Sequence, residues 1–296
     1  MNFSNWMSCI KDDVKLVDVV MPGSHNSGSR RMIPAACCQD STLADQFRHG
    51  VRQFCLRLTT NKLTNKIVFC HSVIKGVSLE SELIELQKVM DENPSEFVIL
   101  DVCEYCDEKF GPITFKFRAD PKEVDRLFEK YLKASKYALT DFEKISDVTM
   151  GDIRKSDKRF LIINEKAEYE YSVNCDYSNP WSPERHGRLA PTFVERATEV
   201  FDKEEKKGIF VLQTQQTAGF DAEVRLGSPR KLDKIIKPYY PRIFEIIKSN
   251  PEYLSLVNVV SSDFMAENDY KIKLILELNL YKNNVIDRDG FESLIK

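Results

Sequence analysis

Seven short apolar segments, spread evenly along the chain and mostly separated by stretches of helical pattern, constrain the fold most strongly. They are residues 14–21, 51–59, 67–70, 97–102, 160–163, 209–212 and 255–260. Apolar runs of this length that alternate with helices are typical of the parallel strands of α/β proteins. No glycine- or serine-rich linker and no short-period repeat divides the 296 residues. The predicted fold is therefore a distorted TIM-like (β/α)₈ barrel, with residues 1–296 as a single domain.

The loop after the first segment distinguishes between two ways of building such a sheet. A doubly wound sheet is the alternative to a barrel, and it would carry a glycine-rich phosphate loop after its first strand. Residues 22–29 read PGSHNSGS, which matches neither the dinucleotide-binding pattern nor the P-loop. The loop instead places His25 just beyond an apolar strand, where barrels present their reacting groups. This placement favours the barrel.

Charge and hydropathy narrow the choice of partners. The formal net charge of −3 argues against nucleic-acid binding through a general positive field, and against strong attraction to an anionic membrane. The N-terminal residues lack a basic region followed by an apolar core, and no window approaches the roughly 18 apolar residues of a spanning helix. We expect a cytoplasmic protein, with a processed secreted form as the alternative. The sequence does not indicate an oligomeric state.

Cysteines are numerous but scattered, and several lie within apolar runs. This distribution predicts reduced, buried thiols in place of a disulfide framework. Cys103 and Cys106 form a CxxC motif, for which metal binding or redox chemistry is the alternative; no second pair follows at zinc spacing. The eight cysteines are Cys9, Cys37, Cys38, Cys55, Cys70, Cys103, Cys106 and Cys175.

Four polar side chains lie on or just beyond predicted strands: His25, Arg57, His71 and Asp263. One imidazole can take a proton from an attacking hydroxyl while the other gives a proton to a leaving oxygen. A guanidinium can hold the charge that grows on a phosphoryl group between them. A carboxylate beside one histidine would fix its tautomer. Each residue alone has a structural alternative, such as a buried ion pair or a helix cap, but together they predict metal-free phosphodiester cleavage.

Several short sequence motifs between Trp6 and about Met265 occur in a combination that is specific to one protein family. They are Trp6-Met7, MPGSHNSGS at 21–29, DQFRHGVRQFCLRL at 45–58, the strand-end His71, NPSEFVILDV at 93–102 and VNVVSSDFM at 257–265. In these words the chain resembles the X domain of phosphatidylinositol-specific phospholipases C, particularly the bacterial-like and X-domain-containing single-domain forms.

The resemblance implies a distorted (β/α)₈ barrel that cleaves the glycerol-side phosphodiester bond by attack of the inositol 2-hydroxyl. In that scheme His25 resembles the general base, His71 the general acid, and Asp263 the carboxylate partner of His25. Arg57 matches the guanidinium that activates the phosphate in metal-independent members. The products would be diacylglycerol and inositol 1,2-cyclic phosphate, made from a phosphatidylinositol lipid at a membrane surface.

Two departures from the family patterns concern metal binding. Bacterial members have His-Asp and Asp-x-Arg, and calcium-dependent members have His-Asn and Glu-x-Asp, whereas this chain has His25-Asn26 and Cys55-Leu56-Arg57. A calcium ion needs several oxygen ligands, preferably charged, so a cation beside Arg57 with Asn26 as its main ligand is not expected. We predict no cofactor and calcium-independent activity. The carboxylate missing at Cys55 lowers activity unless Asp101 or Glu104 takes its place.

Head-group and membrane contacts are less constrained by the sequence. An inositol ring needs convergent donors and acceptors, and the alternative for each candidate is a solvated loop residue. The predicted substrate-binding residues are Asn26, Lys166, Gln213, Gln215 and Tyr177. Residues 32–36 and 218–220 are candidates for transient lipid contact, with inward packing of Met32 and Ile33 as the alternative.

Two other functions remain open, and a third is disfavoured. The same chemistry could release glycosylphosphatidylinositol anchors if the pocket leaves the inositol 6-position free. A weakly active phosphoinositide-binding module is suggested by Asn26 and Cys55. Glycerophosphodiester phosphodiesterases share the barrel but need carboxylate metal ligands after the first strands, which are missing here.

Overall fold

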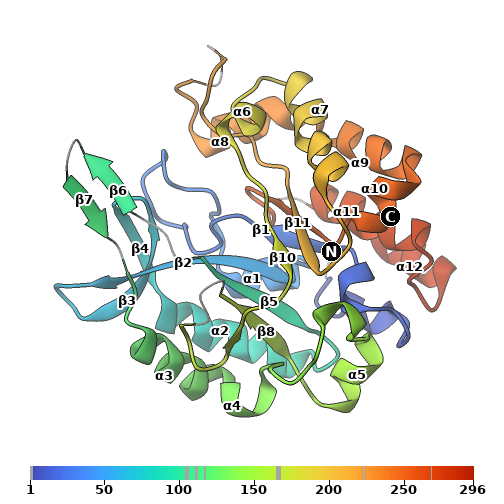
Figure 1. Ribbon diagram of the computed structural model, residues 1–296, viewed down its shortest axis with the longest axis horizontal. Helices are drawn as coiled ribbons and strands as arrows, with labels where there is room; N and C mark the ends of the chain where they lie inside the picture. The colour runs from blue at the N-terminus through green and yellow to red at the C-terminus, as the bar shows by residue number, and fades with distance from the viewer. Residues whose placement is uncertain are drawn as a thin grey trace.

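Eight parallel strands form the centre of the computed structural model (Figure 1). The structure describes residues 3–103, 107–110, 113–116, 118–164, 168–221, 223, 225–267 and 269–296. The eight strands are β1 (Met21–Ser24), β2 (Gln53–Asn61), β5 (Val98–Cys103), β8 (Phe160–Ile163), β9 (Ser172–Val173), β10 (Tyr177–Ser178), β11 (Ile209–Gln213) and β12 (Val259–Ser262). They pair in chain order, and β12 pairs with β1. Among the described residues no ladder joins β9 to β10, so the barrel is open there. The predicted distorted α/β barrel is confirmed.

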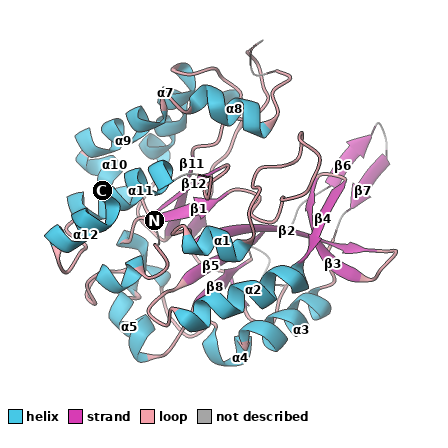
Figure 2. Ribbon diagram, turned by 180° about the vertical axis from the view of Figure 1, so that it is seen from behind, coloured by secondary structure: helices cyan, strands magenta, loops and turns pink. Residues whose placement is uncertain are grey.

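Helices cover the outside of the curled sheet (Figure 2). The α-helices are α1 (Leu43–Arg48), α2 (Leu79–Glu92), α3 (Pro121–Leu132), α4 (Ala134–Tyr137), α5 (Met150–Lys155), α6 (Pro183–His186), α7 (Thr192–Thr198), α8 (Pro229–Ile236), α9 (Tyr240–Ser249), α10 (Pro251–Leu256), α11 (Asp269–Tyr281) and α12 (Arg288–Ile295). The 3₁₀ helices are η1 (Trp6–Cys9), η2 (Leu16–Asp18), η3 (Ile145–Asp147) and η4 (Glu199–Lys203). In the part of the chain that the structure describes, no helix has the length and apolar character needed to cross a membrane.

The second barrel strand continues beyond the sheet into an antiparallel hairpin. β3 (Lys66–His71) pairs with the far half of β2, and β4 (Ile74–Ser78) pairs with β3. β6 (Asp107–Phe110) and β7 (Ile113–Lys116) form a separate two-stranded hairpin beside it (Figure 1). The predicted third strand is therefore real, but it belongs to this hairpin and not to the barrel.

Two predicted strand positions are wrong. The barrel strand after the first apolar run begins at Met21, and residues 14–20 contain the 3₁₀ turn η2. This segment is nevertheless buried, at Leu16, Val17, Val19 and Val20. Hydrophobic periodicity alone does not distinguish a buried irregular segment from a strand. The last strand is 259–262 and not 255–260, because Asn250 caps a helix that begins at Pro251. The short β9 and β10 lie in none of the seven predicted apolar segments.

A fully buried ion pair fixes the start of β2. Arg52 donates from Nε and Nη2 to one carboxylate oxygen of Glu96, over 2.8 and 2.6 Å. Its Nη1 donates to the carbonyl oxygens of Phe47 and Val51 at 2.8 Å. Neither side chain of the pair is exposed to solvent. These bonds hold the end of α1, the start of β2 and the approach to β5 in one arrangement, and thereby set the level at which β2 ends.

Candidate active site

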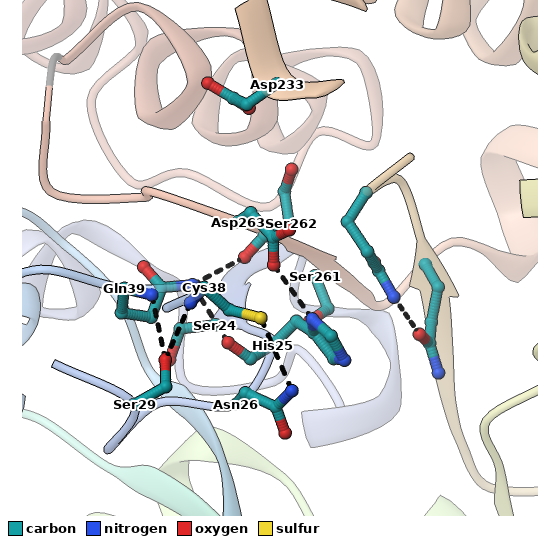
Figure 3. A network of polar contacts seen from close by, with 12 residues as sticks. Ser24, His25, Asn26, Ser29, Cys38, Gln39, Asp233, Ser261, Ser262 and Asp263 are labelled. Atoms are coloured by element: carbon teal, nitrogen blue, oxygen red, sulfur yellow. Dashed lines mark hydrogen bonds and ion pairs between the residues drawn. The ribbon is translucent and has the colours of Figure 1, made fainter. Parts of the chain in front are cut away.

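His25 and Asp263 come together although 238 residues separate them in the chain. Ser24 and Ser262 are register partners at the ends of β1 and β12, so the residue after each strand projects from the same edge. The Nδ1 atom of His25 lies 2.8 Å from an Asp263 carboxylate oxygen (Figure 3), and both side chains are buried. The predicted pairing of these two residues is present in the structure.

Backbone geometry and hydrogen bonds hold the two loops against each other. The chain turns just after each residue through a left-handed conformation, at Asn26 (φ 46°) and Phe264 (φ 52°). The buried Gln39 side chain donates from Nε2 to the carbonyl oxygens of His25 and Ser262, at 3.0 and 2.9 Å. Its Oε1 accepts from the Met265 backbone N–H at 3.0 Å. One amide thus clamps the histidine loop to the aspartate loop (Figure 3).

A buried lysine on α11 holds the loop that carries Asp263. Lys271 donates from Nζ to the backbone oxygen of Asp263 at 2.6 Å and to the Ser262 hydroxyl at 3.2 Å, and it pairs with Asp233. Sequence reasoning missed both Lys271 and Gln39. Polarity is their only signal in the sequence, because Lys271 lies in the helix α11 and Gln39 lies in an irregular loop.

Arg57 faces the outer nitrogen of the same imidazole. Its Nη2 lies 3.4 Å from Nε2 of His25. A guanidinium only donates, and a carboxylate only accepts, so this arrangement is satisfied when His25 carries its proton on Nδ1 and keeps a lone pair on Nε2. We assign that tautomer from the partners. The arrangement presents a proton acceptor next to a fixed positive charge.

His71 is the last residue of β3. In the antiparallel register Leu58 faces Phe69, so β3 runs back along β2 and carries His71 towards the level of Arg57. The hairpin therefore returns His71 to the strand-end edge that carries the other three candidates. Its role as general acid stays a prediction.

A chain of hydrogen bonds runs along the edge from Asp101 to Gln215. The Tyr177 hydroxyl donates to Asp101 at 2.6 Å and accepts from Asn179 at 3.0 Å. Gln213 then donates to Asn179 at 2.5 Å, and Gln215 donates to Gln213. Burial, followed by the nearby Cys55 charge, raises the pKa of Asp101 to about 7. Three predicted substrate-binding residues thus form one connected polar wall.

The other two predicted head-group residues differ. Asn26 is buried and donates from Nδ2 to Cys38 Sγ at 3.4 Å, and its Oδ1 accepts no hydrogen bond within the described residues. Lys166 lies outside the described residues, as do Glu104 and Cys106.

The seven cysteines that the structure describes are all free thiols, as predicted for them, but only Cys38, Cys55 and Cys70 are buried and the other four are partly exposed. Cys55 and Cys103 are in contact, with 3.2 Å between their Sγ atoms. The pKa of the Cys55 thiol is well below its ordinary value because Cys103 donates a hydrogen bond to it and because Arg57 and His25 lie near. The pKa of Cys103 is raised correspondingly. Of the two thiols, Cys55 is therefore the one that loses its proton more readily.

Two clusters in the described part of the chain have donor atoms within 4.8 Å of one another: His25 with Cys38 and Asp263, and Cys55 with Asp101 and Cys103. Both contain sulfur, and neither offers the set of oxygens that calcium prefers. The first is already accounted for by the His25–Asp263 hydrogen bond.

Comparison with solved structures places the fold in a known class. The chain has the distorted (β/α)₈ barrel of bacterial phosphatidylinositol-specific phospholipases C, as the resemblance in sequence implied. The enzyme from Listeria monocytogenes is 17% identical, with a TM-score of 0.62 over 94% of this chain and 99% of that one. A variant of the Staphylococcus aureus enzyme is 16% identical, with a TM-score of 0.66 over 94% and 96% of the two chains. No protein-family profile matches the sequence.

Proposed function

We propose that this protein is a phosphatidylinositol-specific phospholipase C that works without a metal ion. The observation that carries the proposal is the buried His25–Asp263 pair, in which the second imidazole nitrogen of His25 faces Arg57 at the strand-end edge of the barrel. The likeness of fold to the two bacterial enzymes supports it, and so do the sequence words around these residues.

The proposed reaction uses the geometry directly. Nε2 of His25 accepts the proton of the inositol 2-hydroxyl, and that oxygen attacks phosphorus. Asp263 stabilises the imidazolium that forms, and Arg57 neutralises the charge that grows on the phosphoryl oxygens. The glycerol oxygen leaves with a proton from His71. The products are diacylglycerol and inositol 1,2-cyclic phosphate, and no cofactor enters the balance.

Phosphorus NMR of the purified protein with phosphatidylinositol micelles tests this proposal. We expect a cyclic phosphate signal that persists in EDTA and disappears in His25→Ala and His71→Ala. His49→Ala is the matched control, since His49 forms a similar 2.9 Å contact with Asp269 at the C-terminal end of α1. Loss of the signal in EDTA would refute metal independence, and equal loss in the control would remove the assigned roles.

Release of glycosylphosphatidylinositol-anchored proteins is the second candidate, because it needs the same reacting groups. Incubating the protein with cells that display such an anchor separates the two substrates. A third outcome, vesicle binding without turnover, would leave a phosphoinositide-binding module, for which the thiol at Cys55 is the motivating observation.

Membrane contact is proposed at the rim loops, in a cytoplasmic protein that associates transiently with lipid. Ile33 and Phe220 are 52% and 60% exposed on the loops after β1 and β11, whereas Met32 packs inward. Membrane binding has been modulated in the S. aureus enzyme. Ile33→Asp should lower cleavage of vesicle lipid about tenfold, from the lost burial of one aliphatic side chain, and leave cleavage of a soluble short-chain lipid unchanged. Ile286→Asp is the control, being 65% exposed near Cys9 and away from this rim.

A further inference from the structure

Two thiols and a carboxylate converge beside Arg57 on neighbouring strands. Cys55 lies on β2, and Asp101 and Cys103 lie on β5, where Asp101 is the register partner of Cys55 and Cys103 that of Arg57. Cys103 Sγ lies 3.2 Å from Cys55 Sγ and 3.3 Å from an Asp101 oxygen. All three donor atoms lie within 4.8 Å of one another. We propose that Cys55, Asp101 and Cys103 bind one thiophilic cation such as Zn²⁺, with a fourth position open to water.

The spacing suits such an ion. Zinc–sulfur bonds of about 2.3 Å in a tetrahedral site place two sulfurs about 3.8 Å apart, and a sulfur and an oxygen about 3.5 Å apart. The two separations that involve Cys103 therefore need to widen by about 0.6 and 0.2 Å respectively. Rotation of the Cys103 side chain can widen both, because Cys103 is the last residue of β5 and is partly exposed.

Charge supports the same reading. Metal binding releases the protons of its thiol ligands, so a cation between the two sulfurs converts a crowded pair into two ligands. Arg57 lies two residues from Cys55 on β2 and is the register partner of Cys103, and its positive charge beside both thiols favours their thiolate forms. Three singly negative ligands are then balanced by one divalent cation together with the Arg57 guanidinium. Two sulfur donors select Zn²⁺, Cd²⁺ or Cu⁺ over Ca²⁺ and Mg²⁺.

The test is direct metal binding, which does not depend on the proposed phospholipase activity. Protein reduced with a phosphine and stripped with EDTA is titrated with Cd²⁺, and thiolate-to-metal absorption is followed; Zn²⁺ affinity is measured by competition with a chromophoric chelator. We expect one ion per chain. Cys103→Ser, Cys55→Ser and Asp101→Asn should each weaken binding at least about tenfold, as loss of a ligand does.

Cys9→Ser is the matched control, since Cys9 is a partly buried thiol in η1 and lies outside the cluster. It should bind as the wild type does. Circular dichroism checks each variant, and Cys103→Ser decides the matter if the buried Cys55→Ser fails to fold. Wild-type affinity in Cys103→Ser, absence of the thiolate band, or equal competition by Ca²⁺ would each overturn the site.

Discussion

The hydrogen bond between His25 and Asp263 determines which imidazole nitrogen can act as a base. The two groups are 2.8 Å apart and both are buried, so the imidazolium formed during the reaction has a carboxylate as its partner in a poorly solvated place. A hydrogen bond to a charged group of this kind contributes about 1.5–3 kcal/mol. At about 1.4 kcal/mol per tenfold, Asp263→Asn should therefore lower kcat/KM by about 10- to 150-fold.

A second effect enlarges this loss. If the new amide turns its NH₂ group to Nδ1, the imidazole must carry its proton on Nε2, and it then has no lone pair for the inositol hydroxyl. The equivalent change in serine proteases costs about 10⁴ in kcat. The predicted range for Asp263→Asn thus begins at about tenfold and extends to about 10⁴-fold.

Initial rates of cyclic phosphate formation measure the change, and thermal unfolding shows whether the variant is folded. Asp269→Asn is the control, because Asp269 makes a similar 2.9 Å contact with His49, a histidine that is not among the four candidate residues. Loss of one charged hydrogen bond should leave about a tenth of the wild-type kcat/KM or less. If a folded Asp263→Asn retains more than about a third, the assignment of His25 as base is wrong.

Two further predictions concern stability. Glu96→Gln should cost about 3–5 kcal/mol in urea unfolding, because it leaves the fully buried Arg52 without its charge partner; Glu85→Gln, at an exposed pair, should cost less than about 1 kcal/mol. Burial lowers the pKa of His186 to about 4 although its Nε2 lies 3.2 Å from the Gln213 carbonyl oxygen. The unfolded state then binds more protons between about pH 6.5 and 4, so stability should fall by up to about 3 kcal/mol as pH drops through that window. His186→Asn should flatten the fall, and an unchanged urea profile would show that another group causes it.

Much of the site follows from one regularity that is visible in the sequence. Parallel strands bring their carboxyl ends to one edge, so His25 after β1 and Asp263 after β12 were predictable neighbours once a closed order of strands was assumed. The same rule places Gln213 at the end of β11 and Gln215 just beyond it. Tyr177 is the first residue of the short strand β10 and joins them through Asn179, which the rule does not predict. To apply this rule, one needs to know only where each strand ends. Most of the strand ends were predicted within a few residues.

Other features depend on tertiary packing that no local pattern records. The apolar run before β1 was predicted as a strand, but it forms the 3₁₀ turn η2 and the segment that leads into β1. Its residues are apolar because they are buried, and not because they alternate along a strand. β9 and β10 have two residues each, which is too short for any periodicity. Gln39 and Lys271 hydrogen-bond groups that are distant in the sequence or beyond one helical turn, and helix or loop composition gives no sign of such bonds.

The charge beside Arg57 shows how the structure changes the meaning of a departure from a family pattern. The sequence suggested that Asp101 could replace the carboxylate missing at Cys55. Asp101 is nearby, but burial raises its pKa to about 7, so that it is only partly ionised at neutral pH. The pKa of Cys55 is lowered by the hydrogen bond from Cys103 and by the nearby Arg57 and His25, which favours a thiolate where the bacterial pattern has a carboxylate. The substitution therefore exchanges a hard oxygen beside the guanidinium for a soft sulfur that ionises more readily than an ordinary thiol. A site with that exchange is poorly suited to calcium and well suited to a thiophilic ion, which is why the same residue motivates both metal-free catalysis and the proposed cation site.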